Sequence, residues 1–168
     1  MLTQSSGLVL LSPYLPLLFE RMNLTDGQVF RSFEAMQEGM DALSYIVFAN
    51  SVVPEAPRPM ERLICGVASG VPVRPALPVS AENKELIDGL LQSVSQQWKP
   101  LKGTSIEGLR ESFLLREGLI EDRGDSLRLS VSPRPFDMLL DSLPWAYGVM
   151  KFAWMDRAIH VSWRNSDV

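Results

Sequence analysis

The residues that could support catalysis or bind a metal are few and widely spaced. The chain of 168 residues has one histidine, His160, and one cysteine, Cys65. A Cys–His pair can provide a nucleophile and its base, but these two lie far apart in the sequence, and alternation places His160 on the outer face of a strand. One histidine without a CxxC motif is too few for a His-rich metal site. We therefore predict no catalytic residues, no cofactor and no metal.

Paired carboxylates are the other candidates for acid–base chemistry. Glu107 and Glu111 share a helix face, as do Asp137 and Asp141, because each pair is four residues apart. Solvated helix faces account for both pairs, and acidic groups near the first turn complement the helix dipole. No GxGxxG or GxxxxGK[ST] motif indicates a nucleotide site. A hydrolase stays open as an alternative, which requires Cys65 or His160 beside a carboxylate.

Composition and charge narrow the function further. Apolar residues make up 46% of the chain, charged residues 21%, and the net charge is −4 at neutral pH. These values are typical of a globular domain, and the acidic balance argues against nucleic acid, which requires a basic face. Residues 7–19 are the most apolar stretch, but Ser12, Pro13 and Pro16 interrupt it and it is shorter than the roughly 20 residues of a membrane span. We predict no membrane contact and a protein that is cytoplasmic when made.

The first half of the chain shows mainly helical spacing. Ser12 as N-cap and Pro13 at the first position predict a short helix over residues 12–22. A longer amphipathic helix is expected over residues 30–50. Residues 54–78 hold six of the twelve prolines, and we predict a wrapped surface connection there with one short helix.

Two further helices are predicted before the pattern changes. Ser80 is expected to cap a helix that stops before Pro100. Thr104 followed by Glu107 is typical of a capping box, and the helix that it begins is expected to end at Gly118.

The last third alternates with period 2, which is typical of strands. Residues 119–122 and 127–131 are predicted to form a hairpin, and residues 147–154 and 159–163 two further strands. Pro135 begins a short helix between them, which Pro144 ends. The fold class is therefore α+β, with a mainly helical N-terminal part followed by a small antiparallel sheet. We expect a single domain over residues 1–168, with residues 1–6 disordered.

Two short patterns are similar to known functional motifs, but local conformation and charge favour a simpler structural interpretation of each. Arg123-Gly124-Asp125 spells a cell-adhesion tripeptide, but a tight hairpin turn favours Gly and Asp for conformational reasons. The helix from Thr104 and the hairpin after it are similar to the end of a winged helix, which would bind nucleic acid through a basic face. This regulatory function is kept as the alternative, although the local charge is near zero.

Aromatic residues are concentrated near the C-terminus. Three of the four tryptophans, Trp145, Trp154 and Trp163, lie within nineteen positions. Tryptophan is frequent in interface hot spots, but it is at least as often a core residue with a satisfied indole N–H. Our candidate protein contacts are the exposed members of a set of five residues: Arg110, Pro144, Trp145, Trp154 and Trp163.

Five groups of motifs run in order through nearly the whole chain. They are Gly7-Leu8-Val9-Leu10-Leu11 with Pro13, Leu15-Pro16 and Leu18-Phe19-Glu20-Arg21; Leu63-Ile64-Cys65-Gly66; Thr104-Ser105-Ile106-Glu107-Gly108-Leu109-Arg110 with Phe113-Leu114 and Arg116-Glu117-Gly118; Pro135-Phe136-Asp137 with Leu139-Leu140 and Leu143-Pro144-Trp145; and Phe152-Ala153-Trp154-Met155 with Val161-Ser162-Trp163. This series resembles the C-terminal region of tape measure proteins from contractile injection systems, the phage-tail-like particles. Ala153 stands where the family pattern often has Pro.

The resemblance implies a non-enzymatic part in building the particle. Tape measure proteins occupy the tube, help to set its length and engage the baseplate or hub, so tube, hub or baseplate proteins are the expected partners; a homo-oligomer stays open. Family members are much longer, and this chain lacks their extended part before Gly7. One unbroken helix of this chain would reach only about 250 Å at about 1.5 Å per residue. We therefore predict the compact terminal module rather than the measuring rod.

Overall fold

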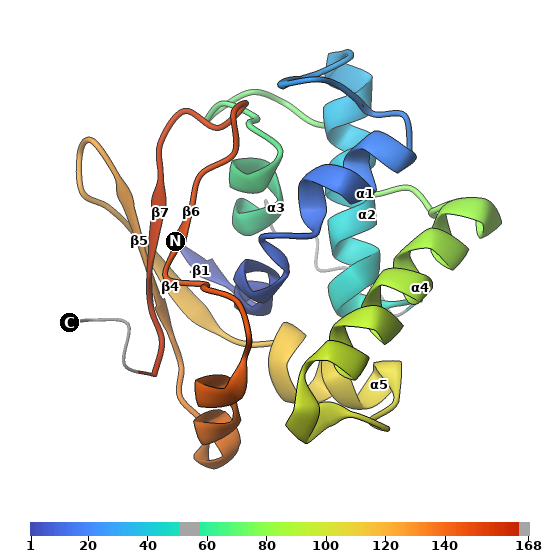
Figure 1. Cartoon of the computed structure of the whole chain (residues 1–168). Helices are drawn as coiled ribbons and strands as arrows, with labels where there is room; N and C mark the ends of the chain where they lie inside the picture. Colours follow the sequence, from blue (N-terminus) through green and yellow to red (C-terminus); the bar gives the residue numbers. More distant parts are fainter. Residues whose placement is uncertain (51–57, 165–168) are drawn as a thin grey trace.

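The computed structural model describes residues 1–50 and 58–164 and has an α+β architecture (Figure 1). The helices are the 3₁₀ turns η1 (Ser6–Leu11), η2 (Lys99–Leu101) and η4 (Pro135–Ser142), the π-helical turn η3 (Arg110–Leu114), and the α-helices α1 (Leu15–Arg21), α2 (Phe33–Phe48), α3 (Pro59–Ile64), α4 (Ala81–Gln97) and α5 (Ile106–Leu109). The strands are β1 (Leu2–Thr3), β2 (Thr25–Asp26), β3 (Val29–Phe30), β4 (Gly118–Asp122), β5 (Leu127–Val131), β6 (Val149–Met150) and β7 (Ile159–Ser162). The predicted fold class is confirmed.

The main sheet is mixed rather than purely antiparallel. Its strand order is β1-β4-β5-β7-β6, and the pair β5–β7 is parallel while the other three pairs are antiparallel. The expectation of an antiparallel sheet is wrong here because a long crossover containing η4 separates β5 from β7, and such a connection lets the second strand run in the same direction. Only Val149–Met150 of the predicted strand over residues 147–154 is paired.

The N-terminal segment is part of this sheet. Residues 1–6 are expected to be disordered, but Leu2 and Thr3 pair with Leu119 and Gly118 of β4. Ser6 begins η1, in which all six residues are buried. The predicted helix start at Ser12 is also wrong, because Ser12 ends η1 and α1 begins at Leu15. Figure 1 shows η1 between the sheet and the helices, so the apolar run that opens the chain forms the centre of the core.

One face of the main sheet is buried and the other is open to solvent. Inward positions are buried, whereas the outward positions Leu2, Leu119 and Val149 are exposed. His160 faces outward as predicted and pairs with Arg128 and Val149. The alternation read from the sequence therefore assigns the faces of β5 and β7 correctly.

Helix starts follow the side-chain caps. The Ser80 hydroxyl accepts a hydrogen bond from the Asn83 amide at 3.2 Å, so the predicted cap of α4 is confirmed. The cap of α5 is Ser105, not Thr104, since the Ser105 hydroxyl accepts from the Gly108 amide at 3.0 Å. This helix continues into the π-helical turn η3 and ends at Leu114 rather than Gly118, which begins β4.

Two predicted loop regions are also described. The hairpin between β4 and β5 turns at Gly124, whose φ of 90° explains the glycine. The short helix expected within residues 54–78 is α3, which begins at Pro59. Residues 54–57 of that connection lie outside the described residues.

Candidate functional site

Two of the candidate contact tryptophans join the C-terminal segment to the N-terminal half. The Trp145 indole N–H donates to the Leu10 carbonyl and that of Trp154 to the Ile64 carbonyl, both at 2.7 Å. Each ring is half-buried. At Gly66 a Cβ would lie 2.5 Å from the Trp154 carbonyl oxygen, and its φ is +74°, so the close approach of Trp154 requires glycine there. These indoles therefore have a structural role in the fold.

Two other candidates, Arg110 and Trp163, lie in the interior. Arg110 Nε donates to the Ile46 carbonyl at 2.9 Å, close to the C-terminal end of α2. Its guanidinium also pairs with Glu107 at 2.8 Å and stacks on the Tyr45 ring. A cation in this place satisfies the last carbonyls of the helix and complements its dipole. The buried position of Arg110 is thus explained without a partner protein.

Pro144 is the exposed member of the candidate set, and the residue after it contacts a side chain that lines a groove. The neighbouring Trp145 meets the Tyr14 ring edge-on, with ring centroids 5.1 Å apart. Tyr14 in turn lines a groove of about 450 Å³ between α1 and α4, which we call the α1–α4 groove. Its lining residues are Tyr14, Leu17, Leu18, Arg21, Glu85, Leu86, Gly89, Leu90, Ser93 and Gln97.

A buried ion pair joins three of the motif groups. Arg116, with 1% of its surface exposed, donates from Nη1 to Asp137 Oδ2 at 2.7 Å and from Nη2 to the Ser112 carbonyl at 2.6 Å. The guanidinium also lies 5.0 Å from the Trp163 ring centroid, and the Trp163 indole donates to the same Asp137 oxygen at 3.0 Å. The expectation that Asp137 belongs to a solvated helix face is therefore wrong. Asp137 lies three residues after Arg134 and accepts a hydrogen bond from the Arg134 backbone amide. This helix-capping spacing is the feature of the sequence that could have indicated a structural role for Asp137.

The pKa of Asp137 lies below its usual value. Burial alone raises it, but the hydrogen bonds from Arg116, Trp163 and the Arg134 amide outweigh the burial. The carboxylate is therefore ionised at neutral pH and forms a charged pair with Arg116.

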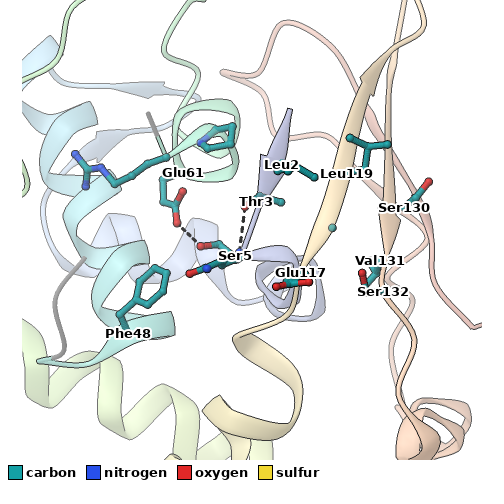
Figure 2. A pocket seen from close by; sticks show the side chains of 14 residues that line it. Leu2, Thr3, Ser5, Phe48, Glu61, Glu117, Leu119, Ser130, Val131 and Ser132 are labelled. Carbon is teal, nitrogen blue, oxygen red and sulfur yellow. Dashed lines mark hydrogen bonds between the residues drawn. The ribbon is translucent and has the colours of Figure 1, made fainter. Parts of the chain in front are cut away.

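A larger pocket of about 590 Å³ lies beside the N-terminal strand (Figure 2). We call it the β1 pocket. It is lined by Leu2, Thr3, Gln4, Ser5, Phe48, Arg58, Pro59, Glu61, Glu117, Gly118, Leu119, Ser130, Val131 and Ser132. Figure 2 shows strands β1, β4 and β5 on one side, with the end of α2 and the start of α3 on the other. No motif in the sequence indicates this pocket, because its walls come from five separate segments.

Glu61 is the buried acidic group of the β1 pocket. Only 1% of its surface is exposed, and its carboxylate accepts a hydrogen bond from the Ser5 hydroxyl at 2.5 Å. Burial raises its pKa, and the lowering effects of Ser5 and of the Arg58 charge do not cancel this rise. Arg58 itself contacts Asp41 at 3.3 Å and Ser44 at 3.2 Å. The nearby cation is thus already engaged by another carboxylate.

The raised pKa of Glu61 predicts that part of the folding stability increases as the pH falls. A folded-state pKa above the unfolded value of about 4.3 means that the folded chain binds the proton more tightly, so stability rises as pH falls through the folded pKa. We expect Glu61→Gln to be at least as stable as the native chain at pH 8 and to lose this rise on acidification. Urea unfolding at a series of pH values from pH 8 down to the unfolded pKa of about 4.3 measures both effects.

Glu121→Gln, at a partly exposed position in β4, is the matched control and should leave the pH dependence of stability unchanged. A Glu61→Gln chain that is clearly less stable than the native one at pH 8 would contradict the assignment.

The candidate catalytic residues are not brought together. Cys65 is fully buried, and burial, followed by the Glu61 charge, raises the pKa of its thiol well above the usual value, which keeps it protonated. His160 is exposed on the open sheet face. Neither residue lines the β1 pocket or the α1–α4 groove. Within residues 1–50 and 58–164, no group of three His, Cys, Asp or Glu side chains is placed to hold a metal ion.

The winged-helix alternative finds no support in the structure. It requires a basic face beside the Thr104 helix, but Glu107 and Glu111 are exposed there while Arg110 is buried. The strands that follow also belong to a five-stranded mixed sheet. None of the helices in the described part of the chain combines the length and apolar character needed to cross a membrane.

Comparison with known proteins agrees with the motif series. The family model described as contractile injection system tape measure protein matches residues 1–163. No curated protein and no solved structure matches the chain. The match extends over nearly the whole chain and includes β1, the β1 pocket, the Arg116–Asp137 pair and all four tryptophans. The chain therefore belongs to the contractile injection system tape measure protein family.

Proposed function

We propose that this chain is a non-enzymatic assembly component of a contractile injection system, a compact terminal module that docks on tube, hub or baseplate proteins. The observation that carries the proposal is the family match over residues 1–163. Membership of this family supports a structural role in a particle. The docking function is our inference from the surface that the fold leaves open.

The shape supports a docking module rather than a measuring rod. The longest helix among the described residues, α4, has 17 residues, which corresponds to about 25 Å at about 1.5 Å per residue. The separation of Cys65 from His160 and the burial of the thiol support a non-enzymatic role.

The surface formed by Pro144 and the α1–α4 groove is the proposed contact. Leu17 in the groove keeps 50% of its surface exposed, although it is a large apolar residue. Trp145 and Tyr14 connect the groove to Pro144. Exposed apolar side chains next to half-buried aromatic rings are typical of protein contact surfaces. The three remaining candidates, Arg110, Trp154 and Trp163, are bonded within the fold and are proposed as its supports rather than as contacts.

Co-purification tests this proposal. The tagged chain is expressed with the particle genes, and captured tube, hub and baseplate proteins are quantified by mass spectrometry. We expect Leu17→Asp and Pro144→Asp to reduce that capture about tenfold or more, since a charge in an apolar contact costs the binding energy of a hot spot. Val29→Asp, at an apolar residue that is 58% exposed in β3, is the control and should retain capture.

Trp145→Ala is less suitable as the first variant because it also removes the hydrogen bond to Leu10. Capture that is equal for Leu17→Asp, Pro144→Asp and Val29→Asp would show that this surface is not the contact. Failure of the native chain to capture any particle protein would contradict the docking role itself.

A further inference from the structure

The β1 pocket has the features of a binding site for an extended peptide. Strand β1 is at the end of the five-stranded sheet, so one of its two edges has no neighbouring strand among the described residues. Met1 and Ile120 exchange backbone hydrogen bonds of 2.7 and 2.8 Å. In an antiparallel pair the next residue, Leu2, must then direct its N–H and C=O away from β4. These groups are available to a further strand.

The side chains around this edge suit a long aliphatic side chain. Leu2, which is 81% exposed, and Leu119 lie on the open face of the sheet, and Phe48 lies across the pocket at the end of α2 (Figure 2). The pocket volume of about 590 Å³ is within the range of sites that enclose a ligand of several bonded groups. A lysine or arginine side chain would place its methylene groups against these apolar residues.

The charged side chains of the pocket that lack an ion-pair partner among the described residues are acidic. Glu61 and Glu117 line it, and neither forms an ion pair with a residue in the described part of the chain. Among the described residues that line the pocket, Arg58 is the one cation, and its guanidinium contacts Asp41 and Ser44 instead. A buried carboxylate without a cation is unfavourable, and a positive charge from outside would relieve that cost.

We propose that the β1 pocket binds a lysine or arginine side chain from an extended segment of a partner protein, whose backbone pairs with the free edge of β1 at Leu2. The ammonium or guanidinium group contacts Glu61, and Glu117 adds a second negative charge at the same pocket. Strand addition supplies the backbone hydrogen bonds, and the pocket supplies the specificity for a basic residue. This inference rests on the proposed docking role and gives the chemistry of one partner segment.

A random heptapeptide library displayed on phage and panned against the native chain tests the pocket without any particle protein. We expect enriched sequences with one Lys or Arg between strand-forming residues. Fluorescence anisotropy then measures the affinity of a labelled synthetic peptide of the enriched sequence. Glu61→Gln should weaken its binding about tenfold or more, because it removes a charge-assisted hydrogen bond. Replacing the basic residue by norleucine should weaken binding equally in the native chain and have little further effect in Glu61→Gln.

Glu121→Gln is the matched control and should bind the peptide with native affinity, and thermal unfolding confirms that both variants fold. The inference is overturned if no sequences are enriched, if enriched peptides lack a basic residue, or if Glu61→Gln binds them as the native chain does. Capture of particle proteins by Glu61→Gln in the co-purification assay separates the two proposals. Undiminished capture together with a failed peptide selection would leave the docking role standing and remove only the β1 pocket.

Discussion

Asp137→Asn is expected to lower the free energy of unfolding by about 3–5 kcal/mol at neutral pH, measured by urea unfolding. The substitution leaves the Arg116 guanidinium buried, 1% exposed, without its counter-charge. Asp137 also accepts from the Trp163 indole and the Arg134 amide, so one change weakens three hydrogen bonds. Breaking one side of a buried pair costs more than the pair itself contributes, because the remaining charge cannot reach water.

Asp141→Asn is the matched control, four residues along the chain. Asp141 pairs with Arg164 at 3.1 Å, but both side chains are well exposed, so its loss should change the free energy of unfolding little. The double variant Arg116→Met with Asp137→Leu should cost less than Asp137→Asn alone, since no unpaired charge remains. Equal effects of Asp137→Asn and Asp141→Asn would show that burial of the Arg116 pair is not important.

The same pair determines the acid sensitivity of the fold. Because the folded-state pKa of Asp137 is below its unfolded value of about 3.9, its contribution to stability is fully present above pH 3.9 and is lost as pH falls through the folded pKa. Glu61 acts in the opposite direction over a higher pH range. The native chain should therefore lose stability at low pH more steeply than Asp137→Asn, which lacks this titration.

Gly7→Ala is expected to be the second severe substitution, with a loss of about 3 kcal/mol of unfolding free energy. A Cβ at this position would overlap the Phe113 carbonyl oxygen and Leu114 Cα, both within the 3.0 Å that real Cβ atoms keep. The obstructing atoms belong to the backbone of η3, so no side-chain rotation can relieve the overlap. The close packing of η1 against η3 at the centre of the core thus depends on this glycine.

Gly89→Ala provides the control in α4. Apart from the backbone of α4 itself and the two adjacent residues, no atom lies within 4 Å of a Cβ built at Gly89, so alanine there should raise stability by about 0.5–1 kcal/mol through helix propensity. Thermal or urea unfolding of the two variants measures both the loss of stability in Gly7→Ala and the gain in Gly89→Ala. A Gly7→Ala chain as stable as the native one would contradict the observed contact between η1 and η3.

The features that the sequence predicts correctly are those that depend on residues close together along the chain. Ser80 caps α4 because its hydroxyl reaches an amide three residues away, and β5 alternates because its neighbours lie on opposite faces. The ordered motifs led to the family without any coordinates, since residue identity and order are properties of the chain. The Trp145 indole illustrates the limit, because its acceptor Leu10 is 135 positions away.

The amino-acid sequence by itself therefore determined the α+β class, the cores of the longer helices, the β4–β5 hairpin and the family. Tertiary structure alone decided that β7 runs parallel to β5, that Asp137 meets Arg116 in the interior, and that Arg110 covers the end of α2. It also decided that five separate segments enclose Glu61 in the β1 pocket. The physical reason is that burial, ion pairing and pocket shape depend on contacts between distant segments, whereas capping and periodicity depend on neighbours along the chain.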